Sequence, residues 1–166
     1  MLQYTVFTPF ASSLFGCRVQ NQKHCIPFGL GPTQPEAALN VLIVEDNSAF
    51  RRSFRAMLAA RFPGMKIHEA WEPAQALSMV EGFMPELVFM DIQLPGQSGL
   101  DLAKKIKGIW PLTSVVILTS HDLPEYREAA LCAGASCFLC KGEIGPQEIE
   151  KLLLSLFPLA KPGSGA

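Results

Sequence analysis

Residues 87–96 read LVFMDIQLPG, and this stretch decides the fold. Its first four residues are apolar, Asp91 follows them, and the Pro95-Gly96 pair is a turn signal. A run this short and apolar, closed by a turn, predicts a strand over 87–91 that is buried on both faces. Asp91 would then lie where the strand meets a loop, at the edge where ligands bind in open parallel α/β sheets. Taken alone, Asp91 could also be a helix-capping or turn residue.

The alternation of short strands and amphipathic helices extends to both sides of this stretch. Further strands are expected at 41–44, 66–70, 115–118 and 135–140, the second of them with a weaker pattern. A helix is expected after each strand. The first helix is indicated by the helical spacing of Phe50, Phe54, Met57 and Leu58. The other four are indicated by residues typical of helix ends, which in chain order are Pro73 and Gly82; Ser98 and Gly99; Asp122, Pro124 and Gly134; and Pro146.

Five strands that alternate with five helices imply one parallel sheet covered by helices on both faces. Right-handed crossovers then produce a doubly wound α/β fold. In such a fold, the carboxyl ends of all strands lie at one edge of the sheet.

Length and composition set the outer limits. The chain has 166 residues, 49% hydrophobic and 17% charged, which suits one well-filled globular domain. Its formal net charge of −1 provides no basic field for nucleic acid, and no apolar run approaches the roughly 20 residues of a membrane span. Residues 1–38 have scattered prolines and no sustained periodicity. A poorly ordered extension is therefore expected at 1–38, one domain at 39–158 and a flexible tail at 159–166.

The five cysteines are odd in number and unevenly spaced, which indicates reduced thiols in a cytoplasmic protein. Cys137 and Cys140 form a CxxC pattern, but residues three apart on a strand point to opposite faces, so no shared metal or redox site is expected. The chain start lacks Lys and Arg, so it does not read as a secretory signal.

Polar side chains follow four of the expected strands: Glu45 and Asp46, Asp91, Thr119, and Lys141. In the expected sheet, these three carboxylates, one hydroxyl and one ammonium converge. Clustered carboxylates repel one another, so a hard divalent cation with oxygen ligands, Mg²⁺, is their natural partner. Asp is an established phosphoryl acceptor, and the metal and Lys141 would offset the charge of a phosphoryl group on Asp91. Thr119 could donate a hydrogen bond to that group.

Four segments in this order resemble the receiver domain of two-component response regulators, over about 40–157. They are VLIVEDN at 41–47, LVFMDIQLPG at 87–96 with SG at 98–99, VILTS at 116–120 and FLCK at 138–141. Each motif alone is moderately specific, and all four in order are highly specific. The resemblance implies a flavodoxin-like, CheY-like sheet with strand order 2-1-3-4-5, and a single-domain response regulator.

The resemblance also assigns the chemistry of the site. Asp91 would accept a phosphoryl group from a histidine kinase or phosphotransfer protein. Asp46 and Asp91 would bind Mg²⁺ directly, together with the backbone carbonyl of Gln93. Glu45 would act on the metal through water.

The resemblance further implies that Thr119 and Lys141 contact the phosphoryl group. Phe138 lies at the family's aromatic switch position, which is linked to movement of Thr119. One departure occurs: Gly142 follows Lys141, where the family usually has a proline after a cis bond. A cis bond before a non-proline residue costs roughly 2.5–4 kcal/mol, so a trans bond or a glycine-adapted loop is expected.

Each residue also has a plain structural interpretation. Asp46 could cap the first helix, as could Asn47 or Ser48; Lys141 could be a solvated surface residue; and Phe138 could be a core residue. Arg51, Arg52 and Arg55 are expected on a solvated helix face, from which they could meet an acidic partner. The joint occurrence of all the site residues in one pattern favours the functional interpretation.

Two other functions stay open. A phosphorylation-independent interaction module on the same fold is supported only by the departure at Gly142. A small flavodoxin-like enzyme would need a phosphate-cradling loop after the first strand, where Glu45 and Asp46 would repel a phosphate, and it ranks lower. The protein is therefore expected to be no enzyme but a phosphoacceptor that assists its own phosphorylation and dephosphorylation.

After the last helix only residues 158–166 remain, with no nucleic-acid signature. The output is therefore expected to be a protein contact or a phosphate relay, without direct contact to nucleic acid. Phosphorylation would stabilise a pre-existing active arrangement of the fourth helix, fifth strand and fifth helix. That face could bind an unidentified downstream protein or form a homodimer.

Overall fold

The computed structural model describes residues 38–157. Five strands form one sheet: β1 (Asn40–Val44), β2 (Lys66–Ala70), β3 (Leu87–Asp91), β6 (Ser114–Thr119) and β7 (Cys137–Cys140). The helices are α1 (Ser48–Arg61), α2 (Pro73–Phe83), α3 (Gly99–Ile109), α4 (Pro124–Cys132) and α5 (Pro146–Leu156). A short hairpin of β4 (Gln93–Leu94) and β5 (Gln97–Ser98) follows β3, and a turn of 3-10 helix spans Lys141–Glu143. The extension expected at 1–38 lies outside the described residues except for Ala38, and the tail expected at 159–166 lies outside them entirely. The domain expected at 39–158 is described up to residue 157.

The sheet has the order β2-β1-β3-β6-β7, and all neighbouring strands are parallel. With its five strands numbered along the chain, this is the order 2-1-3-4-5, so the expected doubly wound fold is confirmed. The strand order reverses between β1 and β3. The crevice at the carboxyl ends of these two strands is the place where such sheets bind ligands.

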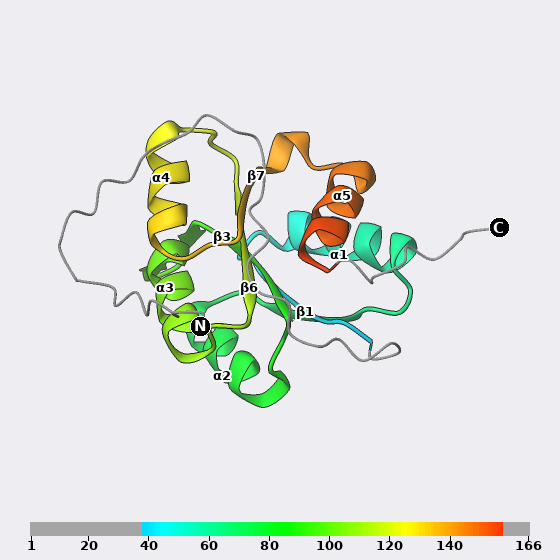
Figure 1. The fold of residues 1–166 in the computed structure, drawn as a ribbon, viewed down its shortest axis with the longest axis horizontal. Coiled ribbons are helices and arrows are strands. Elements are labelled where there is room, and N and C mark those ends of the chain that lie inside the picture. The colour runs from blue at the N-terminus through cyan, green and yellow to red at the C-terminus, as the bar shows by residue number, and fades with distance from the viewer. Residues whose placement is uncertain (1–37, 158–166) are drawn as a thin grey trace, which may run out of the picture.

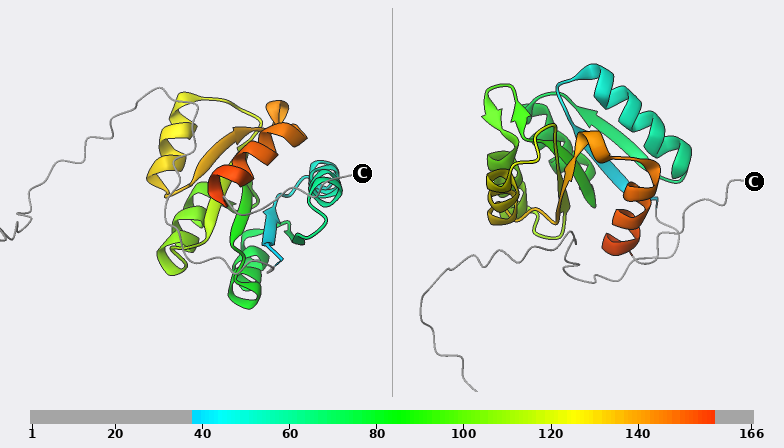
Figure 2. Two further views of the ribbon diagram at one scale, coloured as in Figure 1. Left: turned by 45° about the vertical axis from the view of Figure 1, so that its right-hand side comes forward. Right: turned by 90° about the horizontal axis from the view of Figure 1, so that it is seen from above.

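Helices cover both faces of the sheet. Helices α1 and α5 lie on one face, and α2, α3 and α4 lie on the other (Figure 1). Within the first pair the helices lie side by side (Figure 2), and Arg61 of α1 forms an ion pair with Glu150 of α5.

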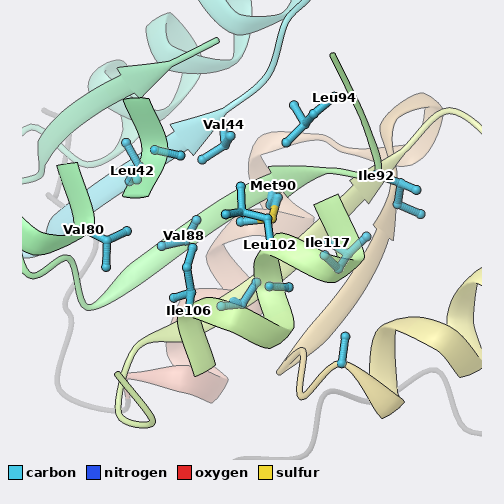
Figure 3. Close-up of a cluster of buried hydrophobic side chains, with 14 of the residues drawn as sticks. Leu42, Val44, Val80, Val88, Met90, Ile92, Leu94, Leu102, Ile106 and Ile117 are labelled. Atoms are coloured by element: carbon cyan, nitrogen blue, oxygen red, sulfur yellow. The ribbon is translucent and has the colours of Figure 1, made fainter. Parts of the chain in front are cut away.

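The core is divided by the sheet into two clusters. On the side of α2, α3 and α4, alternate strand residues such as Leu42, Val88 and Met90 point toward helix residues such as Leu102 and Ile106 (Figure 3). All five of these side chains are at most 1% exposed. The strands read as continuous apolar runs because each of their faces meets a helix layer.

The second cluster lies under α1 and α5. Ile43 and Phe89 of the sheet pack there with Phe54 and Leu58 of α1 and Leu153 of α5. The rings of Phe54 and Phe89 meet edge to face, with centroids 5.0 Å apart. This packing fixes α1, and with it the loop that connects α1 to β1.

Side chains close two helix starts as capping residues. Asn47 caps α1 by accepting two hydrogen bonds from backbone N–H groups of the first turn, and Ser98 caps α3 in a similar way. The expected cap at Asp122 is wrong, because Leu123 occupies the cap position of α4 and makes no side-chain bond. The Asp122 carboxylate instead pairs with Arg127, whose Nε lies 2.6 Å from Asp122 Oδ1.

Two further expectations concern the backbone and the sulfurs. No cis peptide bond occurs among residues 38–157, so the trans bond expected before Gly142 is confirmed. Cys140 is a free thiol, whereas Cys137 is disulfide-bonded, so the expectation of reduced thiols is wrong for Cys137. Composition and spacing cannot show which sulfurs the folded chain brings within bonding reach. No helix in the described part is long and apolar enough to cross a membrane.

Candidate functional site

Three carboxylates gather at the carboxyl ends of β1 and β3. Oxygens of Glu45, Asp46 and Asp91 lie within 4.8 Å of one another. Val44 is in register with Met90, so the next residue on each side, Glu45 after β1 and Asp91 at the end of β3, lies at the same level of the sheet. Glu45 is fully buried and Asp91 is 6% exposed, whereas Asp46 is exposed.

Lys141, at the end of β7, places a positive charge among these carboxylates. Its Nζ lies 2.6 Å from Glu45 Oε2 and 3.1 Å from Asp91 Oδ2, and only 12% of its side chain is exposed. The ammonium also lies 4.8 Å from the centre of the Phe50 ring, within the range of a cation–π contact. Lys141 is therefore no solvated surface residue, and its ammonium lies next to the two carboxylates with which it was grouped.

Burial makes ionisation of Glu45 costly. Desolvation raises the pKa of this carboxyl above its ordinary value of 4.5, against the opposing effect of the Lys141 ammonium. The negative charge of Asp91 adds to the increase. The charge at the centre of the site is therefore only partly balanced by Lys141.

Asp46 does not cap helix α1. Asn47 caps α1, so the capping interpretation of Asp46 is wrong. Within the described residues, the Asp46 carboxylate has neither an ion pair nor a hydrogen bond. Its exposed carboxylate adds a further negative charge to the site, which no ion pair within residues 38–157 neutralises.

The donor set fits Mg²⁺. Three carboxylates stand against one ammonium, and the buried Glu45 Oε2 has no partner other than Lys141 in the described part of the chain. Hard divalent cations take oxygen ligands of this kind, with one or two carboxylates and several waters. Asp46 and Asp91 would hold the ion, and the buried Glu45 would act from behind them.

Thr119 lies at the edge of the same site. It ends β6, whose residue Leu118 is in register with Asp91, and it is only 2% exposed. Its Oγ1 accepts a hydrogen bond of 3.1 Å from the backbone N–H of His121. In this arrangement its hydroxyl is engaged with the loop after β6, and no hydrogen bond to Asp91 occurs within residues 38–157.

The other two residues expected at the site, Phe138 and Gln93, lie around the carboxylate cluster. Phe138 of β7 is half-buried and lies opposite Ile117 of β6, with the Arg127 guanidinium 4.8 Å from its ring centre. Gln93 is exposed in β4, two residues beyond Asp91. The structure thus brings together Glu45, Asp46, Asp91 and Lys141, and places the others around them.

Two residues of the site escaped the sequence analysis. Arg51 was expected on a solvated face, yet its Nη1 lies 2.6 Å from the backbone oxygen of Glu45. Gly99 packs so closely behind Asp91 that a Cβ on it would lie 1.8 Å from the Asp91 backbone oxygen. Helical spacing gave no sign of the Arg51 contact, and the glycine after the Ser98 cap was the only sign of the second.

Known proteins resemble this chain along the same residues. The family model of the response regulator receiver domain matches residues 41–154. Response regulator MprA of Mycobacterium tuberculosis is 29% identical over 124 residues, which are 75% of this chain and 51% of the relative. Transcriptional regulatory protein YxjL of Bacillus subtilis is 31% identical over 111 residues, 67% of this chain and 50% of the relative. The chain spans about half the length of these curated relatives.

Solved structures agree in fold. A CheY-like receiver domain protein from Methanospirillum hungatei superposes with a TM-score of 0.66 at 26% identity, covering 73% of this chain and 95% of that one. The receiver domain of the response regulator NarL from Mycobacterium tuberculosis gives 0.64 at 27% identity, over 70% and 93% of the two chains.

Proposed function

Since the chain belongs to the response regulator receiver domain family, we propose that Asp91 is a phosphoacceptor in a phosphorelay. The observation that carries this proposal is the position of the Asp91 carboxylate, 3.1 Å from Lys141 Nζ and beside Glu45 and Asp46. A carboxylate at a strand end between a cation and a metal-binding pair is suited to attack phosphorus. The receiver domain proposed for this role spans 39–158.

The donor is a phosphohistidine on a histidine kinase or phosphotransfer protein. One Asp91 carboxylate oxygen forms a new bond to phosphorus as the bond between phosphorus and the donor imidazole nitrogen breaks. The imidazole nitrogen leaves with that electron pair. The ring takes up a proton from solvent and is released as neutral histidine. Bound Mg²⁺ would offset negative charge on the transferring phosphoryl oxygens. Lys141 stabilises the same charge from the side of β7.

Thr119 and Phe138 connect the site to the surface. We assign Thr119 to the phosphoryl group, which it reaches by exchanging its bond with the His121 backbone for one to a phosphoryl oxygen. That exchange pulls the start of the loop before α4. Phe138 in the neighbouring strand follows the change in packing, and the arrangement of α4, β7 and α5 shifts.

The output is a changed protein contact in the cytoplasm. Exposed leucines occur on the helices of the α4–β7–α5 region, with Leu123 (47% exposed) just before α4, Leu131 (60%) in α4 and Leu154 (42%) in α5. Exposed apolar side chains of this kind suit binding of a protein partner or a second copy. The curated relatives are about twice as long as the matched region, so the proposal concerns the receiver domain alone. We assign proteins as the direct binding partners of this domain.

Phosphorylation by a small donor tests this function. The protein is incubated with acetyl phosphate and Mg²⁺, and its intact mass is measured beside Asp91→Asn and the control Asp101→Asn, which changes an exposed residue of α3. Wild type and D101N should gain one phosphoryl group, whereas D91N or a chelator should prevent the gain. An unlabelled wild type, under conditions that label a control receiver, would support the phosphorylation-independent interaction module instead.

A further inference from the structure

Arg51 reaches from α1 back to the loop that carries two of the acidic residues. Its Nη1 lies 2.6 Å from the backbone oxygen of Glu45 and 3.4 Å from that of Asp46. The side chain is only 14% exposed, although the helical pattern assigned it to a solvated face. A guanidinium has several donors in a rigid fork, so one group can bind neighbouring carbonyl oxygens at once.

The other side of the same guanidinium is anchored to β2 and the residue after it. Arg51 Nε lies 3.3 Å from Glu69 Oε1, and the Trp71 ring lies 5.9 Å from the guanidinium carbon. Arg55, one turn farther along α1, pairs with the second oxygen of Glu69 at 3.1 Å. Glu69 therefore holds Arg51 in place while Arg51 holds the loop.

The loop needs such a support because its carboxylates repel. Glu45 is tied to the sheet through its N–H, which donates to the Ala70 carbonyl, and Asn47 is tied to α1 as its cap. Asp46 lies between these two points with an exposed carboxylate. Without a bond to the carbonyls, the Glu45-Asp46 peptide could rotate and turn the Asp46 carboxylate away from Asp91.

We propose that Arg51 is a positioning residue of the site, which fixes the backbone of Glu45 and Asp46 so that their carboxylates face Asp91. This inference rests on the proposed function, since it concerns the ability of the site to bind Mg²⁺. Groups that orient metal ligands from behind contribute measurably to metal affinity. Arg51 acts through the loop and contacts neither the metal nor the phosphoryl group.

Arg55 provides a matched control. It lies on the same helix and pairs with the same carboxylate, but it has no bond to the loop among the described residues. If Arg51 only linked α1 to β2, Arg51→Met could lower the unfolding temperature, but neither Arg51→Met nor Arg55→Met would lower the affinity for Mg²⁺. A positioning role separates them in metal affinity.

The experiment is a calorimetric titration of Mg²⁺ into wild type, R51M, R51K and R55M, with metal-free unfolding temperatures measured in parallel. We expect R51M to bind Mg²⁺ about tenfold more weakly than wild type, and R55M within about twofold of it. R51K keeps the charge but loses the fork, so it should also bind more weakly than wild type. It keeps the test valid if R51M does not fold.

Three outcomes bear on the inference. Weaker binding in R51K, with R55M unchanged, supports it. Equal Mg²⁺ affinity in wild type and R51K, or equal weakening in R55M, overturns it while the phosphoacceptor function of a labelled wild type stands. A wild type that binds no Mg²⁺ and takes no label overturns the proposed function and this inference together.

Discussion

Lys141 Nζ lies 2.6 Å from Glu45 Oε2, which joins the last strand of the sheet to the first across the site. The contact lies almost entirely out of water, since the two side chains are 12% and 1% exposed. This contact holds the Lys141 ammonium in a position from which it also contacts Asp91. The stability of the metal-free protein and the chemistry of the site therefore both depend on the Lys141 ammonium, which faces two buried carboxylates.

Removing the ammonium should destabilise the metal-free protein. Lys141→Met leaves Glu45 and Asp91 buried beside each other without a cation, so we expect a loss of about 3 kcal/mol in the free energy of unfolding. Urea unfolding in the presence of a chelator measures it. Lys105→Met, on the exposed side of α3, is the control and should change stability by less than about 0.5 kcal/mol. Unchanged stability in K141M would mean that the pair does not balance the site.

The raised pKa of Glu45 predicts a specific pH dependence. A carboxyl whose folded-state pKa lies above its unfolded value contributes stability below the unfolded value, and this contribution is lost as pH rises through the folded pKa. Without metal, Glu45→Gln should therefore be more stable than wild type at neutral pH. The difference should shrink as pH falls toward and below 4.5, the ordinary value of the group. Urea unfolding of both proteins across this range tests it, and a difference that grows toward acid pH would contradict it.

Gly99 should be intolerant of any side chain. A Cβ there would lie 1.8 Å from the Asp91 backbone oxygen, so the Gly99→Ala protein must shift the strand end that carries Asp91. We expect a loss of about 1–3 kcal/mol in unfolding free energy and reduced labelling by acetyl phosphate. Gly108→Ala, on the same helix and with nothing within 4 Å, should instead gain about 0.5–1 kcal/mol. Equal stability of the two variants would show that the close packing is not required.

Thr119 should be dispensable for labelling but required for the response. In Thr119→Ala, the His121 N–H loses its acceptor, and no hydroxyl remains to follow the phosphoryl group. We expect Asp91 to be labelled still, while binding of beryllofluoride, a phosphoryl mimic, no longer changes hydrogen exchange in residues 119–132. Thr119→Ser should retain the wild-type change. A full response in T119A would remove Thr119 from the switch.

The strands were predictable because both faces of the sheet are covered. The bounds of β3 match those expected, since a buried strand is a short apolar run with clear ends. The bounds of the edge strand β2 match as well, although it is only partly buried and its pattern is weaker. The two-residue strands β4 and β5 were missed because they are too short to show a period of two. Only the Pro95-Gly96 turn between them was evident, and Gly96 adopts a φ of +78° there.

The site was predictable to the extent that topology determines it. Parallel strands bring Glu45, Asp91 and Lys141 to one edge whatever the details of their side chains. Contacts made by long side chains cannot be inferred in this way. Arg51 leaves a polar helix face to reach a carbonyl, and Asp122 pairs with Arg127 although an acidic residue before a proline resembles a cap.

The most direct test of the central claim is to locate the phosphoryl group. After incubation with acetyl phosphate and Mg²⁺, borohydride reduces an aspartyl phosphate to homoserine, which peptide mass analysis assigns to a position. The account predicts homoserine at position 91 in the wild-type protein and no homoserine in D91N. Homoserine at another position, or none while a control receiver is converted, would contradict it.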